Sequence, residues 1–181
     1  MNDNARQIIH GARVILREPR PSDELDRVEA GLDPEFAQMV GHLGPDPPTL
    51  AEGEVRSWYA RIAANPHAWI VEYHGRCIGA ARLDKLDPST RDAWYAIGLF
   101  RPEHRGQGFG QEVTRLVLSH AFGPLALDRV RLRVLEFNQR AIACYQQCGF
   151  AEVAREPVQL GDIAAIDVIM EARSPLASSA A

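Results

Sequence analysis

The clearest chemical signal in the chain is a glycine-rich hexapeptide between a predicted strand and a predicted helix. Its sequence is Arg105-Gly106-Gln107-Gly108-Phe109-Gly110. Glycine at alternate positions lets the backbone approach a ligand closely. The helix that begins here directs unpaired N–H groups, and the positive end of its dipole, toward the loop. This arrangement predicts a site for an anion, most readily a phosphate group.

The hexapeptide by itself is compatible with more than one kind of loop. A Walker loop requires Gly-Lys followed by Ser or Thr, and the hexapeptide contains no lysine. The dinucleotide fingerprint is G-x-G-x-x-G, and here the third glycine comes one residue too early. A glycine-rich turn without a ligand stays open on these residues alone.

A second segment, from Asn138 to Phe150, follows the next predicted strand. A short helix in it places Tyr145 one turn before its glycine stop, Gly149. Taken singly, Tyr145 is most simply a packed core residue, and Asn138 is most simply a helix cap. Their position after the glycine loop is what makes both of them candidates for a site.

Together the two segments resemble the GNAT superfamily of N-acetyltransferases. Its acetyl-CoA signature is Gln/Arg-x-x-Gly-x-Gly/Ala, which Arg105, Gly108 and Gly110 match at every fixed position. The likeness is strong over residues 93–150 and extends more loosely over 14–172. It implies an α/β fold with a mixed, mostly antiparallel central sheet, helices on both faces and a V-shaped splay between the two central strands.

The resemblance implies acetyl-CoA as the co-substrate and assigns residues to it. The strand edge at 98–100 would pair with the pantetheine arm, and the amides at 106–111 would hold the pyrophosphate. The implied cofactor-binding residues are Gly98, Leu99, Phe100, Arg105, Gly106, Gln107, Gly108, Phe109, Gly110, Gln111, Asn138, Ala141 and Tyr145. Tyr145 would also be catalytic, because a phenol beside the sulfur can protonate the departing thiolate.

The general base is the point at which the sequence departs from the family. Many relatives have a carboxylate five residues before the asparagine, and this chain has Arg133 there. Glu72, Asp92 and Glu136 remain as candidates, acting directly or through water.

The acceptor is predicted from the charge of the front half of the chain. Residues 18–54 contain ten acids and two arginines, and the family shapes its acceptor site from this region. Clustered negative charge attracts a polycation, although acids also lie on solvated helix surfaces. We therefore predict a small polycationic amine, aminoglycoside- or polyamine-like, bound by Glu24, Asp33 and Glu35.

Two alternatives stay open beside this prediction. The front half resembles the branch that contains ribosomal-protein N-terminal, polyamine and some aminoglycoside 6′-acetyltransferases, so a peptide N-terminus is the alternative acceptor. A non-catalytic module that binds acetyl-CoA is an alternative of a different class. The net charge of −4 argues against nucleic acid as a partner.

The remaining expectations concern the chain as a whole. Apolar periodicity, glycines and prolines predict strands at 14–16, 68–73, 76–83, 93–100, 130–134, 151–155 and 163–172, and helices at 22–31, 49–64, 109–122 and 141–148. One domain over residues 5–173 and a disordered tail over 174–181 are expected.

Three cysteines, Cys77, Cys144 and Cys148, lie outside any zinc-ligand spacing and are expected to be free buried thiols, so no metal is predicted. No apolar run reaches the roughly 20 residues that span a bilayer, and the first residues do not resemble a signal peptide. A cytoplasmic enzyme without membrane contact is expected, with a homodimer as a mild expectation.

Overall fold

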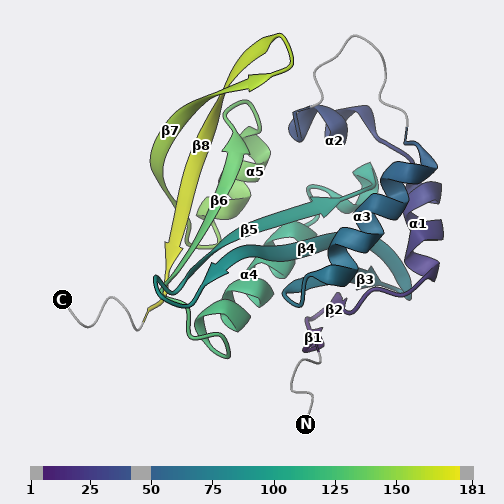
Figure 1. Cartoon of the computed structure of the whole chain (residues 1–181), viewed down its shortest axis with the longest axis horizontal. Helices are drawn as coiled ribbons and strands as arrows, with labels where there is room; N and C mark the ends of the chain where they lie inside the picture. Colours follow the sequence, from purple (N-terminus) through teal and green to yellow (C-terminus); the bar gives the residue numbers. More distant parts are fainter. Residues whose placement is uncertain (1–5, 42–49, 176–181) are drawn as a thin grey trace.

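One mixed sheet organises the chain, of which the computed structural model describes residues 6–41 and 50–175. Its strands and helices, in chain order, are β1 (Ile9–His10), β2 (Ile15–Arg17), α1 (Ser22–Ala30), α2 (Pro34–Met39), α3 (Glu52–Ala64), β3 (Ala68–Tyr73), β4 (Arg76–Asp87), β5 (Asp92–Leu99), a 3₁₀ turn (Pro102–His104), α4 (Phe109–Phe122), β6 (Arg129–Leu135), α5 (Gln139–Gln146), β7 (Ala151–Leu160) and β8 (Ile163–Arg173). The strand order is β1-β2-β3-β4-β5-β6-β8-β7 (Figure 1).

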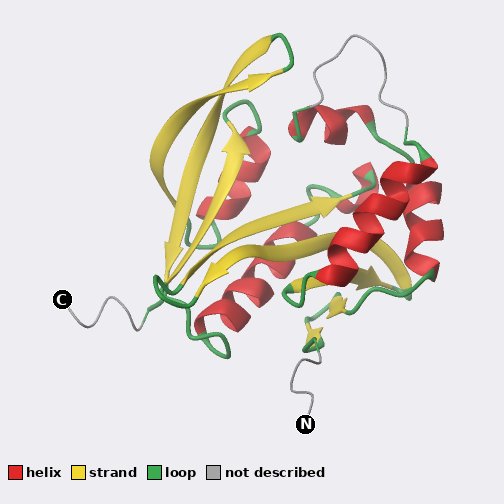
Figure 2. Ribbon diagram, in the orientation of Figure 1, coloured by secondary structure: helices red, strands yellow, loops and turns green. Residues whose placement is uncertain are grey.

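Both faces of the central strands are buried, which explains why helices cover the sheet on two sides (Figure 2). On β3, Trp69 and Val71 belong to the core cluster under α4, whereas Ala68 and Ile70 pack with Ile62 of α3. Successive side chains of a strand point to opposite faces, so one strand supplies two cores. The predicted α/β architecture with helices on both faces is confirmed.

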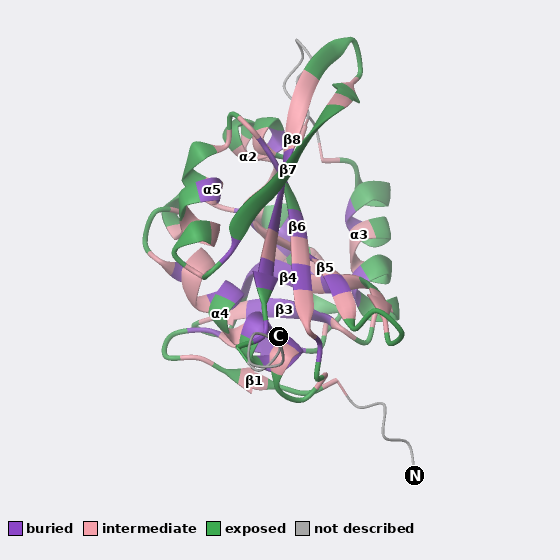
Figure 3. Ribbon diagram, turned by 90° about the vertical axis from the view of Figure 1, so that its left-hand side faces the viewer, coloured by how far each residue is buried: buried purple, intermediate pink, exposed green. Residues whose placement is uncertain are grey.

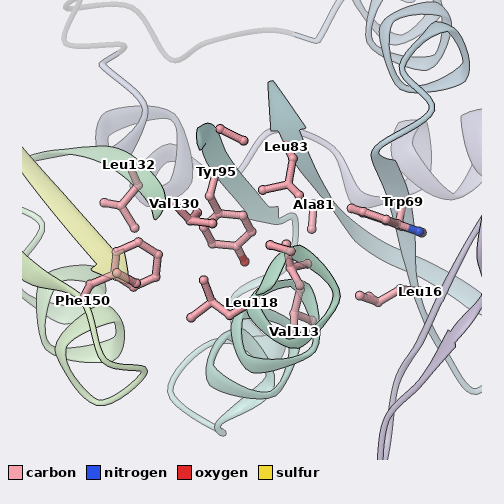
Figure 4. Packing of buried hydrophobic residues seen from close by; sticks show 14 of the residues in the cluster. Leu16, Trp69, Ala81, Leu83, Tyr95, Val113, Leu118, Val130, Leu132 and Phe150 are labelled. Carbon is pink, nitrogen blue, oxygen red and sulfur yellow. The ribbon is translucent and has the colours of Figure 1, made fainter. Parts of the chain in front are cut away.

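Helix α4 runs over the predicted range, 109–122, because its buried residues recur at helical spacing. Val113 and Leu118 pack against Tyr95 of β5 and Val130 of β6 in the larger core (Figure 4). This helix therefore fixes the glycine loop, from which it starts, relative to both central strands.

The two central strands separate after a short stretch of parallel pairing. β5 and β6 pair only at 92–94 with 129–131. Beyond Trp94, β5 continues against β4 as far as Leu99, while β6 continues against β8 as far as Leu135. The remaining sheet pairs are antiparallel. The expected V-shaped splay is thus present, and Figure 1 shows β5 and β6 diverging from their common origin.

Several local predictions differ from the structure. The helix predicted at 49–64 is α3, which begins at Glu52, while Thr49 lies outside the described residues. Ala51 precedes its first turn, and the Ala51 N–H donates to the Glu54 carboxylate (2.9 Å). The short helix α2 was not predicted. It exists because Asp33 caps it through the Phe36 N–H (2.7 Å) and Pro34 occupies its first position.

The end of the chain and the cysteines can be described in part. The expected tail lies mostly outside the described residues, although Ser174, its first residue, is buried and its N–H donates to the Asp128 carbonyl (2.9 Å). All three cysteines are free; Cys77 is buried, whereas Cys144 and Cys148 are half-buried. Strand β7 forms an exposed edge of the sheet (Figure 3). No described helix has the length and apolarity needed to cross a membrane.

Candidate active site

A cavity of about 1000 Å³ fills the wedge that opens between β5 and β6. The edge of β5 at Gly98 and Leu99, and Phe100 just after it, line one wall, and Asn138 and Tyr145 of the α5 region line the opposite wall. The glycine loop forms one end. The structure therefore brings the predicted strand edge, loop and helix together around one space.

The glycine loop is built as a cradle for an anion. Gly106 and Gly108 have φ of +71° and +82°, which non-glycine residues adopt only at a cost. Gly108 caps α4, and the first helical hydrogen bond runs from the Glu112 N–H to the Gly108 carbonyl (3.0 Å). The N–H groups at 109–111 precede that bond and have no helical partner, so they remain available to a phosphate.

Two loop residues of the predicted set do not present their side chains to the cavity. Phe109 is 3% exposed and packs in the core, with the Arg13 guanidinium 4.2 Å from its ring centre. Gln107 donates to the Glu103 carbonyl (2.6 Å) and accepts from Arg13 at its own carbonyl (2.9 Å). Only the backbones of Gln107 and Phe109 are therefore candidates for cofactor binding.

Arg105 lines the cavity, but its charge is balanced by carboxylates of the protein itself. Its side chain is only 9% exposed and forms ion pairs with Asp33 and with Glu35 (3.1 Å). Partial burial disfavours the Asp33 carboxylate, but the Phe36 N–H and the Arg105 guanidinium outweigh that effect and lower the pKa of Asp33. Arg105 thus ties α2 to the glycine loop.

Tyr145 lies on α5 among other aromatic rings. Its ring packs edge-on against Tyr95 (6.4 Å between centres) and Phe150 (5.8 Å). Burial raises the pKa of the Tyr145 phenol, which keeps it protonated at neutral pH. It lines the cavity, and no hydrogen bond of its hydroxyl occurs within the described residues. The side chain is therefore a protonated donor facing the wedge.

Asn138 has a local structural role as well as a place on the cavity wall. It caps α5, with its Oδ1 accepting the Ala141 N–H (3.2 Å). The Ala141 amide is consequently occupied, whereas the Asn138 side-chain amide remains able to donate into the cavity.

The structure adds a buried polar chain that the sequence did not reveal. The Tyr95 hydroxyl and Thr114 Oγ1 are 3.0 Å apart, and Thr114 Oγ1 donates to the Gly110 carbonyl (2.7 Å). Tyr95, Thr114 and Gly110 all line the cavity, so this chain links β5 to the first turn of α4. The aromatic character of β5 was the only sequence signal for it.

The acids predicted to bind the acceptor lie elsewhere. Glu24, Asp33 and Glu35 do not line the cavity. Glu35 pairs with Arg105 and also with Arg140 (2.9 Å). Of the nine acids at 18–54 that the structure describes, five form ion pairs with arginines, namely Asp23, Asp26, Glu29, Asp33 and Glu35. Much of the acidic segment is therefore neutralised by arginines, most of which are distant in the sequence.

The candidate bases are also engaged and lie off the cavity wall. Glu72 pairs with Arg17 and Arg20, Asp92 with Arg129 (2.7 Å) and Arg131 (2.8 Å), and Glu136 with Arg155 (3.5 Å). In the described part of the chain, Glu54 and Asp167 are the carboxylates that line the cavity.

The face of the cavity formed by α1, α2, α3 and β4 has a different character, and we call it the α3 side. Its charged and aromatic members are Arg27, Phe36, Glu54, Trp58, Arg61 and Arg82. The Phe36 ring lies against Gly98, where an added Cβ would come within 3.1 Å of it. Above it, Leu160 of the β7–β8 hairpin approaches Gly41, where an added Cβ would lie 3.1 Å from Leu160 Cδ2.

The splayed sheet and the glycine loop at its opening define the acyl-CoA-binding class of α/β proteins, and the comparisons with known proteins agree. Residues 13–151 match the model of the acetyltransferase (GNAT) domain, so the chain belongs to the GNAT family. With the family come the enzyme class, acyl transfer, and the co-substrate, acetyl-CoA, both as predicted.

Curated relatives and solved structures fall in the same family. The chain is 33% identical over 75 residues to spermidine N(1)-acetyltransferase of Vibrio cholerae (41% of this chain, 43% of that protein). It is 29% identical over 83 residues to the protein of that name from Escherichia coli K12 (46% and 44%). These matches span less than half of each relative's length.

Among solved structures, a GNAT acetyltransferase of Bacillus anthracis superposes with a TM-score of 0.79 at 13% identity, covering 93% of this chain and 99% of that one. Spermidine N-acetyltransferase of Vibrio cholerae, in complex with CoA and spermine, superposes with a TM-score of 0.73 at 20% identity, covering 90% of this chain and 96% of that one. RimJ of Mycobacterium smegmatis, in complex with CoA-disulfide, superposes with a TM-score of 0.76 at 17% identity, covering 96% of this chain and 90% of that one. At these identities the likeness concerns the fold.

Proposed function

We propose that this chain transfers an acetyl group from acetyl-CoA directly to a primary amine. The observation that supports this most strongly is the joint lining of one wedge by the edge of β5, the unpaired amides of the glycine loop and the protonated Tyr145. Acetyl-CoA supplies a thioester whose carbonyl an amine can attack.

The residues of the wedge suit each part of such a transfer. The amides at 109–111 bind negative charge at the helix start, and the Asn138 amide is free to donate. Backbone N–H groups near Leu99 are the donors that would polarise the carbonyl, and the Tyr145 hydroxyl gives its proton to the departing sulfur. The acceptor amine also has to lose a proton, and Glu54 and Asp167 are the described wall carboxylates from which that base is to be sought.

The acceptor amine approaches from the α3 side, because the glycine loop and α5 occupy the other end of the wedge. A polycation such as spermidine or an aminoglycoside is the acceptor predicted from the acidic segment, with a peptide N-terminus as the alternative. Five of those acids are paired with arginines, so the main support for a polycation is the similarity of this chain to spermidine acetyltransferases.

The first test is release of CoA thiol from acetyl-CoA in the presence of amines. The panel contains spermidine, an aminoglycoside, peptides with free N-termini and simple alkylamines, and calorimetry measures acetyl-CoA binding separately. Amine-dependent thiol release is expected. Binding of acetyl-CoA without release on any amine would instead indicate a non-catalytic binding module and contradict the proposed transfer.

A further inference from the structure

The α3 side contains a buried arginine that forms no ion pair with a described carboxylate. Arg27 of α1 is 5% exposed and lines the cavity. Its Nη1 donates to the Gly31 carbonyl, and its guanidinium carbon lies 4.5 Å from the centre of the Phe100 ring. No ion pair of Arg27 occurs within the described residues, although buried arginines are almost always paired. Burial lowers the pKa of Arg27, and the charge of the nearby Glu54 carboxylate offsets this effect only in part.

The charges around Arg27 give the α3 side a positive balance. Arg61 and Arg82 line the same side, and Glu54 is its carboxylate. Arg82 is compensated by Asp84 (2.7 Å), and Glu54 accepts the Ala51 N–H at the start of α3 (2.9 Å). Asp33 and Glu35, two of the acids predicted to attract a polycation, are paired with arginines, so this side is suited to an anionic group.

The rest of this side is apolar and aromatic. The rings of Phe36 and Trp58 both meet Phe100 edge-on, at 6.4 Å and 5.4 Å between centres. Met39 and Leu160 close the space above them. Such a wall suits a ligand with an apolar body between its polar ends.

The geometry limits the separation between the reacting amine and the anionic group. The proposed transfer takes place at the strand edge beside Gly98, and Phe100 lies two residues further along extended backbone, roughly 7 Å away. The Arg27 guanidinium is 4.5 Å from the Phe100 ring. An acceptor that reaches both points is therefore a short molecule with one polar group near each end.

Building on the proposed acetyl transfer, we infer that the acceptor is a primary amine that carries a carboxylate at the other end of a short apolar body, and that Arg27 binds this carboxylate. A free amino acid with a distal amine and the N-terminus of an acidic peptide share this chemistry. Arg27 is then a specificity-determining residue, because a neutral or cationic group in its place leaves a buried cation unpaired.

The test compares amines of equal length that differ in the charge of their far end. The probes are 6-aminohexanoate, hexylamine and 1,6-diaminohexane, each measured by CoA-thiol release at saturating acetyl-CoA. A charged hydrogen bond corresponds to a preference of about 10- to 100-fold. We expect 6-aminohexanoate to exceed hexylamine in kcat/KM by that factor and diaminohexane by more. The dipeptide amides Gly-Glu and Gly-Gln form a second pair, and a larger carboxylate preference there identifies a peptide as the source.

Substitutions then locate the preference. Arg27→Gln is expected to raise KM for 6-aminohexanoate about 10-fold or more while leaving KM for acetyl-CoA and turnover of hexylamine nearly unchanged, and Arg27→Lys is expected to restore part of the preference. The matched control is Arg56→Gln on α3, an exposed arginine that does not line the cavity.

The outcomes separate this inference from the proposed function. A preference for diaminohexane or spermidine, or an equal loss on all three amines in Arg27→Gln, overturns the anionic acceptor and leaves acetyl transfer intact. Acetyl-CoA binding without thiol release on any amine overturns both. The end-group preference of the unmodified protein decides the question even if the Arg27 variants do not fold.

Discussion

At the scale of single residues, the site depends on a few side chains whose environments differ. Tyr145 is kept protonated by burial, whereas Asp33 is kept ionised by the Arg105 guanidinium and the Phe36 N–H. Both effects follow from the general rule that burial favours the neutral form and a hydrogen-bonded counter-charge favours the ionised form. Tyr145, the proposed proton donor, and Asp33, which supports the loop, are therefore distinct residues with opposite requirements.

Replacing Tyr145 with phenylalanine tests its role as a proton donor. Positioned acid catalysis contributes roughly 10²- to 10⁴-fold, so we expect Tyr145→Phe to lower kcat by about that factor. Acetyl-CoA affinity, measured by calorimetry, should stay within about twofold because the ring and its packing remain. Tyr59→Phe on α3 is the control, since Tyr59 does not line the cavity. An unchanged kcat would make Tyr145 a packing residue.

At the scale of elements, the site is the junction between the end of strand β5, the glycine loop, which requires glycine at 106 and 108, and the start of helix α4. Arg105 joins this junction to α2 through Asp33 and Glu35. The Tyr95–Thr114–Gly110 chain joins it to β5. Helix α2 and strand β5 therefore both hold the glycine loop in place, and a loop fixed in advance lowers the entropic cost of the proposed binding.

Gly108 is the position at which the loop tolerates substitution least. Gly108→Ala is expected to lower the free energy of unfolding by about 1–2 kcal/mol, because alanine is strained at positive φ. Gly108→Glu should in addition abolish acetyl-CoA binding by placing a carboxylate beside the pyrophosphate. Urea unfolding and calorimetry measure the two effects.

The control for Gly108 is Gly53→Ala in α3, where an added Cβ meets nothing within 4 Å. Alanine there should be neutral or stabilising, since glycine in a helix is unfavourable by about 0.5–1 kcal/mol. Retained micromolar binding of acetyl-CoA by Gly108→Glu would contradict the assignment of the loop.

At the scale of the whole molecule, arginine pairs connect segments that are distant in the chain. Arg17 binds Asp23 and Glu72, Arg76 binds Asp26 and Glu29, and Arg105 binds Asp33 and Glu35. The acidic front half and the arginines are thus complementary parts of one fold. This explains why the local excess of acid does not produce an acidic cavity.

Stability is expected to fall in two stages as pH decreases. Burial lowers the pKa of His67 and His120, so their contribution is present above about pH 6.5 and is lost below it as they are forced to take up protons. The pKa of Glu112 is also lowered, because hydrogen bonds from Arg13 and Val14 outweigh its partial burial. Its contribution is present above about pH 4.3 and is lost as pH falls further.

Thermal unfolding measured across pH checks both stages. Glu112→Gln should reduce the loss below about pH 4.3 and leave the histidine stage unchanged. Glu52→Gln is the control, since Glu52 is an exposed carboxylate without a hydrogen bond of its side chain among the described residues. A melting temperature that stays level from pH 7 to 4 would show that the histidines do not contribute.

The sequence by itself determined most of the elements and the loop, although not the short helix α2 or strand β1. Helix 109–122, the strands on either side of it and the need for glycine at 106 and 108 follow from apolar periodicity and from backbone sterics, which act over a few residues. The Asn138 to Tyr145 segment was identified in the same way, because a cap and one helical turn are also local features. The splay came from the family resemblance and is confirmed.

Only the tertiary structure decided what the charges do. Asp33 and Glu35 were predicted to bind the acceptor, and they pair instead with Arg105, about seventy positions away in the chain. The Tyr95–Thr114 contact and the isolation of Arg27 likewise depend on which elements pack together. The composition gives the number of charged residues, but the electric field in a cavity depends on which of these residues are paired. The pairing is decided only when the chain has folded.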